Sequence, residues 1–287
     1  MPFSRVTLDT NSGITDIALV RDKKAFEIVS TMLGIFGGSG FYSLLDNAET
    51  AVRETPFGLP SSPITLGTIG RQEVAFIARH GVHHEYPPHK IPYKANIYAF
   101  KELGVSRIIA PAAVGSLKKE IGPGTFVVPD QFVNFANRDD TFFNEMPVTH
   151  VSAADPYCPE LRKLVVEMAK PLNLHVHERG TVVVVNGPRF ASRAESSFYQ
   201  SLGDIINMTQ YPELILAREM EMCYASVCLV TDYDVGLQGE KPVSAQDVAE
   251  GFRQNSEKLK RLILDCIPNV PAARGCNCKN ALENARF

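Results

Sequence analysis

The sequence predicts one α/β domain with a mostly parallel or mixed β-sheet flanked by helices. Two observations support this fold class. From Leu33 onward, short runs rich in Val, Ile and Phe, bounded by Gly or Pro, alternate with longer segments of helical periodicity. No internal repeat or low-complexity linker interrupts this alternation, so we expect a single domain.

The predicted strands and helices follow from these patterns in chain order. The predicted strands are 33–36, 73–78, 107–114, 125–129, 180–186, a short one at 204–206, and 224–231. The predicted helices between them are 93–104, which ends at Gly104, 159–172, 192–203 and 212–222.

A last helix is predicted after Ser244. Ser244 and Asp247 form an S-x-x-D signature of a helix N-terminus. An apolar stripe at helical spacing follows it, made of Val248, Phe252, Leu259, Leu262, Ile263 and Cys266. Pro268 and Pro271 end the pattern.

Three segments are expected along the chain: an N-terminal extension (1–31), the α/β domain (32–268), and a C-terminal tail (269–287) with a C-x-C pair, Cys276 and Cys278. One such pair offers at most two ligands, too few for a structural zinc site without His or Cys from elsewhere. Reduced thiols and a disulfide, local or between subunits, both stay open for the tail.

Composition excludes several classes of function. The 287 residues are 45% hydrophobic and carry a net charge of −3, without a block of Lys and Arg to bind a nucleic-acid backbone. No apolar stretch approaches the roughly 20 residues that span a bilayer. The first residues are too polar for a secretory signal, so a cytoplasmic protein without nucleic-acid or membrane partners is predicted.

Candidate chemistry lies at strand ends, because ligands of open α/β sheets bind beyond the carboxyl ends of the strands. The loop GGSG, which contains Ser39, follows the first strand and could turn its backbone N–H groups onto an anion. It matches neither common nucleotide-loop motif. Arg79 and His80 follow the second strand, and the guanidinium fork of an Arg matches two oxyanion oxygens.

The histidines after Arg79 do not predict a metal site. His83, His84 and His89 lie close to His80, but their spacing presents no shared helical face, and Pro87-Pro88 breaks any helix that could align them. No metal is expected here.

Asp232 and Asp234 follow the last predicted strand. Because they alternate, both side chains point the same way in an extended segment. Such a pair could hold a metal, act as glycosidase carboxylates or bind a nitrogen-rich base, and a solvated strand end is the simpler alternative. Phe190, in the turn GPRF, could stack on a flat ligand or fill the core. Thr209 is a helix N-cap, an anion donor, or both.

Taken together, these segments resemble the trimeric purine nucleoside phosphorylase family, and within it the 5′-methylthioadenosine phosphorylases. The likeness covers Leu33 to about Pro268. It rests on IFGGSGFY, ARHG, PPHKIPYKANIYAFKELGV, AVGSL, PGTFVVPDQF, GPRFASRAES, NMTQYPELILARE and CYASVCLVTDYD, in this order.

The resemblance implies a role for each matching residue. Phosphate ligands would be Ser39, Arg79, His80 and Thr209, with the backbone near Ala113 closing the site. Phe190 and Met208 would flank base and ribose, and Asp232 and Asp234 would read the purine and act in catalysis. His84 would approach the 5′ substituent of a neighbouring subunit's substrate, and Val248 would line the 5′ pocket together with Ala245 and Ala249.

The resemblance further implies the fold of this family, with a mixed central sheet, and phosphorolysis of S-methyl-5′-thioadenosine in purine and methionine salvage. No cofactor would be needed, since inorganic phosphate is a co-substrate, and the assembly would be a homotrimer or a hexamer of two trimers. The alternative within the family is a broader purine nucleoside phosphorylase acting on adenosine, inosine or guanosine. Outside it, a non-catalytic nucleoside-binding protein stays open, because Ala112 stands where many relatives have a phosphate-binding Thr. The cysteine-containing tail is similar to that of some archaeal members, which implies a disulfide.

Overall fold

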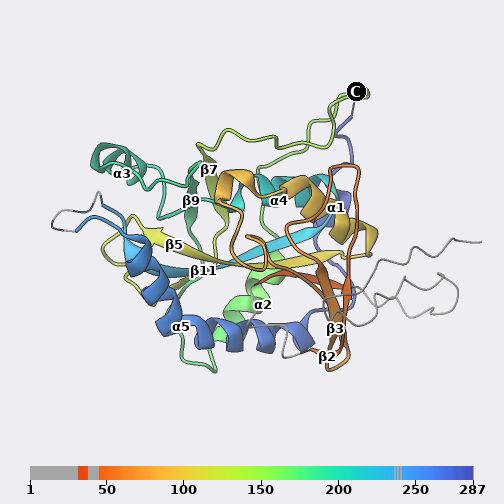
Figure 1. Cartoon of the computed structure of the whole chain (residues 1–287), viewed down its shortest axis with the longest axis horizontal. Coiled ribbons are helices and arrows are strands. Elements are labelled where there is room, and N and C mark those ends of the chain that lie inside the picture. The colour runs from red at the N-terminus through yellow and green to blue at the C-terminus, as the bar shows by residue number, and fades with distance from the viewer. Residues whose placement is uncertain (1–31, 38–44, 236, 238, 240, 287) are drawn as a thin grey trace, which may run out of the picture.

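A mixed β-sheet runs through the middle of the molecule, with helices on both faces (Figure 1). The computed structural model describes residues 32–37, 45–235, 237, 239 and 241–286, and the elements below belong to these ranges. The strands are β1 (Leu33–Phe36), β2 (Asp46–Ala51), β3 (Ile64–Ile69), β4 (Gln72–Ile77), β5 (Arg107–Ser116), β6 (Phe126–Val127), β7 (Gln131–Asn134), β8 (Val176–His177), β9 (Thr181–Val184), β10 (Ile205–Asn207) and β11 (Cys223–Tyr233).

Five α-helices and three 3₁₀ turns complete the described elements. They are η2 (Pro88–Lys90), α1 (Tyr93–Glu102), α2 (Pro159–Ala169), α3 (Arg193–Tyr199), α4 (Gln210–Glu219), α5 (Ala245–Cys266), η3 (Ile267–Asn269) and η4 (Asn277–Asn280). None of these helices is both long and apolar enough to cross a membrane.

The central strands of the sheet have their carboxyl ends at the same end of the sheet. Its main path is β2-β3-β4-β1-β5-β10-β9-β7, and β11 lies beside β5. The pairs β1–β4, β1–β5 and β5–β11 are parallel, whereas β10 runs antiparallel to β5. The residues that follow β4, β5 and β11 therefore gather on one side of the molecule.

Each face of the sheet has its own apolar core. Alternate residues of β5 point to opposite faces. Ile108 lies in one core with Ile97 and Phe100 of α1 and Leu214 of α4. Ile109 lies in the other core, against α2 and α5. In Figure 1 the pair α1 and α4 lies above the sheet and the pair α2 and α5 below it. The predicted α/β class with a mixed sheet is confirmed.

Most predicted elements are present with shifted ends. Ser192 forms a capping box with Glu195 at the start of α3, and the Ser244 side chain accepts from the Asp247 N–H at the start of α5. In the apolar stripe of α5, the second half is buried, but Phe252 is exposed. The residues of the stripe therefore pack into the core only from Leu259 onward.

Strands β2, β3, β7 and β8 were not predicted. Strand β2 has the sequence DNAETA, in which Ala51 alone is buried, so its apolar pattern is absent. It lies at the edge of the sheet, where pairing with β3 rather than burial holds it. The predicted strand 125–129 is reduced to two residues, β6. The N-terminal extension (1–31) lies outside the described residues.

Candidate active site

Asp232 and Asp234 lie together over the end of β5, as their alternation predicts. Asp232 pairs with Gly115, and the register shifts between Val230 and Asp232. A Cβ placed on Gly115 would lie 3.1 Å from Asp232 Oδ1 and 3.8 Å from Asp234 Cβ, so both side chains border the same backbone position. The irregularity re-aims Asp232 relative to a regular strand, as bulges beside functional sites commonly do.

Burial favours the protonated form of both carboxylates. It raises the pKa of Asp232 to about 6, with the nearby Asp234 and Asp247 acting in the same direction and a 2.7 Å hydrogen bond from Thr231 Oγ1 opposing them. Burial likewise raises the pKa of Asp234, against a hydrogen bond from Ser196. Asp234 Oδ2 has no partner among the described residues. A carboxyl group poised near neutrality can donate a proton.

Arg79 lies beside the end of β1 and the middle of β5. Its Nε and Nη2 donate to the two oxygens of Glu213 at 2.7 and 2.8 Å, and Nη1 donates to the carbonyl of Pro111 at 3.0 Å. Its guanidinium lies 4.9 Å from the ring centre of Phe36. Counting partners in the described part of the chain, three of the five N–H donors are used, and two are left for an anion.

His80 is a neutral imidazole with a defined tautomer. Burial lowers its pKa to about 4, and the charge of Arg79 and the neighbouring His84 add to this effect. Nδ1 lies 2.9 Å from the carbonyl oxygen of Tyr86. A carbonyl only accepts, so Nδ1 carries the proton and Nε2 is an acceptor. The ring of His84 stacks on His80 with centroids 4.5 Å apart, and His84 is exposed.

Thr209 and Ala113 are linked by Asn207, at the end of β10. The Nδ2 of Asn207 donates to the Ala113 carbonyl at 3.1 Å. Its Oδ1 accepts from the backbone N–H groups of Thr209 and Gln210 at 2.6 and 2.8 Å. Thr209 makes no side-chain cap bond to α4, because Asn207 takes that role. The Thr209 hydroxyl, 3.3 Å from the same oxygen, is free of the predicted capping task.

Met208 lies between β10 and α4, Phe190 lies in the connection between β9 and α3, and Val248 lies in α5. Met208 lies against the turn at Gly187, where a Cβ would lie 2.5 Å from its Sδ. Phe190 follows that turn and is 36% exposed, so it does not fill the core. Val248 is half-buried in the first turn of α5. Three residues later in the same helix, a Cβ placed on Gly251 would lie 2.5 Å from the carbonyl oxygen of Thr231. The start of α5 therefore packs directly on the end of β11.

The structure describes Ala112 but not Ser39, the predicted phosphate ligand of the GGSG loop. Ser39 and most of the GGSG loop lie outside the described residues. The first residue of this loop, Gly37, is described. Its N–H donates to the carbonyl oxygen of Ile77 at 3.0 Å, and Ile77 precedes Arg79 by two residues. Ala112 is buried in the core of the α1 and α4 face, so it adds no polar group to the site.

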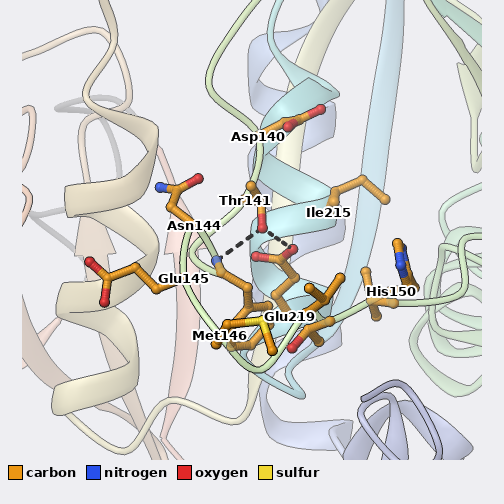
Figure 2. Close-up of a pocket in the computed structure, with 12 residues that line it drawn as sticks. Asp140, Thr141, Asn144, Glu145, Met146, His150, Ile215 and Glu219 are labelled. Atoms are coloured by element: carbon orange, nitrogen blue, oxygen red, sulfur yellow. Dashed lines mark hydrogen bonds between the residues drawn. The ribbon is translucent and has the colours of Figure 1, made fainter. Parts of the chain in front are cut away.

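A cavity of about 620 Å³ lies elsewhere, between the segment 140–151 and α4 (Figure 2). Figure 2 shows Thr141 and Glu219 pointing toward each other; the Thr141 hydroxyl donates to Glu219 at 2.7 Å. Burial raises the pKa of Glu219. None of the predicted site residues lines this cavity. The candidate site is therefore defined by the strand-end side chains.

Sequence reasoning missed three residues that hold the site together. Glu213, fully buried, pairs with Arg79 and also accepts from Tyr224 Oη at 2.8 Å. Asn207 and Ser196 position Thr209 and Asp234. Asn207 could have been found from its place directly after a strand and before a helix, where Asn commonly caps. Glu213 and Ser196 lie within helices and carry no such signal.

Comparisons with known proteins agree with this arrangement. The family model of the Phosphorylase superfamily matches residues 32–268. The S-methyl-5′-thioadenosine phosphorylase of Pyrococcus horikoshii is 52% identical over 88% of this chain and 97% of its own length. The enzyme of that name from Mycolicibacterium smegmatis is 50% identical over 85% and 93%. A solved structure of a variant of the Schistosoma mansoni adenosine/methylthioadenosine phosphorylase, in complex with adenine, has a TM-score of 0.83 at 33% identity and covers 89% of this chain and 99% of that one.

Proposed function

Because the chain belongs to the Phosphorylase superfamily, we propose that it cleaves S-methyl-5′-thioadenosine with inorganic phosphate, giving adenine and 5-methylthioribose 1-phosphate. Relatives of that name, about half identical to this chain over most of its length, support the substrate. The carrying observation is the carboxylate pair of half-buried Asp232, with a pKa near 6, and buried Asp234, at the same end of the sheet as Arg79.

Phosphate lies beneath the sugar in this proposal. The two unused N–H groups of Arg79 bind its oxygens, and the Thr209 hydroxyl, the backbone near Ala113 and Ser39 complete the set. Neutral His80 accepts a hydrogen bond at Nε2 from the hydroxyl of monohydrogen phosphate. The Arg79–Glu213 pair is neutral as a whole, so it orients the guanidinium but leaves phosphate free to keep its nucleophilic charge.

The base lies against the two carboxyl groups. A phosphate oxygen bonds to C1′ as the C1′–N9 bond breaks, and the electron pair moves into the purine. Protonated Asp232 then donates its proton to N7, a step typically worth about 10²–10⁴-fold. Asp234 accepts from the exocyclic amino group through Oδ2, the atom without a described partner. Bound phosphate stabilises the positive charge that develops on the sugar, so no metal is required.

The opposite end of the substrate meets apolar side chains. Met208 and Phe190 flank base and ribose, and Val248 faces the 5′ group near the end of β11. His84 approaches the 5′ group of a neighbouring subunit's substrate, which fits its exposure.

A phosphate-dependence assay tests this function. Purified enzyme is incubated with methylthioadenosine, with and without phosphate, and adenine and the sugar phosphate are quantified. We expect equal amounts of the two products, and only with phosphate. Asp155→Asn, a substitution at an exposed loop position, serves as the matched control for carboxylate variants. No adenine release, or release that ignores phosphate, would overturn the proposal.

A broader purine nucleoside phosphorylase is the second candidate. Val248 is accompanied by Ala245 and Ala249 on the first turn of α5, and such small side chains leave room for a 5′-hydroxyl and water. Comparing kcat/KM for methylthioadenosine, adenosine and inosine decides between the two. Asp232→Asn combined with Asp234→Ala should shift the preference towards 6-oxopurines. Unchanged inosine turnover relative to adenosine would contradict this account of base recognition.

We further propose a homotrimer, or a hexamer of two trimers, in the cytoplasm. Phe135, just after β7, and Phe198, in α3, are exposed and their ring centres lie 6.0 Å apart, which fits a subunit contact at this place. Six free thiols fit a reducing compartment. Light scattering measures the assembly, and Phe198→Glu should dissociate it if this contact holds subunits together.

A further inference from the structure

Four cysteines from three distant segments meet at the edge of the sheet opposite the candidate active site. Cys158 precedes α2, Cys223 begins β11, and Cys276 and Cys278 belong to the tail. All four are buried, and their sulfur atoms lie within 4.8 Å of one another. The tail pair, too small for a metal by itself, thus gains two further sulfur ligands.

The spacing of the sulfurs suits a tetrahedral metal centre. Cys276 Sγ lies 3.7 Å from Cys158 Sγ and 3.4 Å from Cys223 Sγ. Four sulfurs placed about 2.3 Å from one Zn²⁺ are about 3.8 Å apart. A disulfide needs about 2.0 Å, and the structure describes all six cysteines as free.

The surroundings also suit thiolates. Cys158 lies at the N-cap position of α2, where the helix dipole favours a negatively charged group. Leu161 and Val165 of α2 and the nearby chain residue Ile267 belong to the same buried apolar cluster as the four cysteines. A closed apolar shell is a usual setting of structural zinc, which has no open coordination position.

We propose that Cys158, Cys223, Cys276 and Cys278 bind one Zn²⁺ as a structural centre. Binding forms four Zn–S bonds and releases the four thiol protons, without any oxidation or reduction. Two disulfides in the same place would require an oxidant to remove four electrons. In a reducing compartment, clustered cysteines bind metal more often than they form such bonds.

The centre fixes the tail to the beginning of the central strands. Nearby contacts already join these parts: Arg107 donates to the Ala273 carbonyl, and the Gly275 N–H donates to Glu160, each at 2.7 Å. Cys223 and Asp232 are nine residues apart on β11, about 30 Å along the strand. The metal therefore stabilises the fold and takes no part in the reaction, so the inference stands apart from the proposed function.

Metal analysis of the full-length protein tests the proposal. The protein is purified in the presence of reductant and without chelator, and zinc and free thiols are counted per chain. We expect about one zinc per chain, released when a mercurial titrates the thiols, and about a tenth or less in Cys276→Ser with Cys278→Ser. Cys266→Ser, a buried cysteine outside the cluster, is the matched control and should keep its zinc.

A second measurement covers variants that fail to fold. The wild-type chain, produced under zinc limitation, is titrated with Co²⁺ alone. One equivalent should give the intense absorption of tetrahedral thiolate coordination and raise Tm, while kcat at moderate temperature stays unchanged. Four free thiols with no zinc and no Co²⁺ spectrum would overturn the proposal. So would two disulfides, seen as a mass four units lower than that of the reduced chain.

Discussion

The variant Asp232→Asn separates two effects of the raised pKa of Asp232, one on the stability of the fold and one on the rate of the reaction. The pKa of Asp232 rises from 3.8 to about 6 in the folded protein. A difference of this size corresponds to about 3 kcal/mol. The native state binds the proton more tightly than the unfolded chain, so stability falls as pH rises from about 4 to about 6. It stays at the lower value above that range.

An amide is uncharged throughout this range, so the pH-dependent loss disappears in Asp232→Asn. At pH 8 the variant should be more stable than the parent by up to about 3 kcal/mol, or on the order of 5 °C in Tm, and at pH 4 the two should be equal. The activity should change in the opposite direction. The amide cannot transfer a proton to the purine, so kcat/KM should fall by about 10²–10⁴-fold.

Denaturant unfolding at pH 4, 6 and 8 measures the first effect, and adenine release measures the second. Asp155→Asn, an exposed carboxylate in a loop, should leave both quantities unchanged. The parent's kcat/KM should decline above about pH 6, as Asp232 loses its proton. A variant less stable than the parent at pH 8, or equally stabilised at pH 4 and pH 8, would refute the reasoning.

Four further variants probe the same end of the sheet. Gly115→Ala places a methyl group 3.1 Å from Asp232 Oδ1, so nucleoside kcat/KM should fall at least about tenfold in steady-state assays while the KM for phosphate stays constant. Arg79→Ala leaves the buried Glu213 unpaired, and urea unfolding should show a loss of about 3–5 kcal/mol. Arg79→Met with Glu213→Gln should recover most of this stability but not phosphate binding. His80 has a pKa of about 4, so its replacement by Asn should leave the shape of the pH–rate profile between pH 5 and 8 unchanged.

Local patterns predicted the elements that position the site. Strand β1 has the predicted bounds, and Ser192 and Ser244 begin helices as their capping signatures indicate. Asp232 and Asp234 share a side because strand alternation is a property of a few consecutive residues. Such features need no knowledge of the rest of the chain.

Contacts between distant segments could not be predicted in this way. Arg79 and Glu213 are 134 residues apart, and Cys158 and Cys276 are 118 residues apart. Neither pair leaves a periodic or spaced pattern in the sequence, because the sheet order, not the chain order, makes them neighbours. The guanidinium of Arg79 could therefore be recognised from the sequence as an anion ligand, but the Glu213 carboxylate that orients it could not.

The two ends of β11 have opposite effects on the stability of the fold. At its carboxyl end, desolvation raises the pKa of Asp232 and Asp234, and carboxyl groups with raised pKa values lower stability at neutral pH. At its amino end, the proposed zinc centre joins β11 to α2 and the tail. The centre therefore offsets the loss of stability, and it does so at a place that no substrate has to enter. Sites about 30 Å apart that share no side chain act independently on stability. The effects of Asp232→Asn and of the Cys276→Ser, Cys278→Ser pair should therefore add to within about 0.5 kcal/mol in a double-mutant cycle. A larger coupling would mean that the strand transmits strain from the tail to the carboxylates, and the metal would then influence the reaction after all.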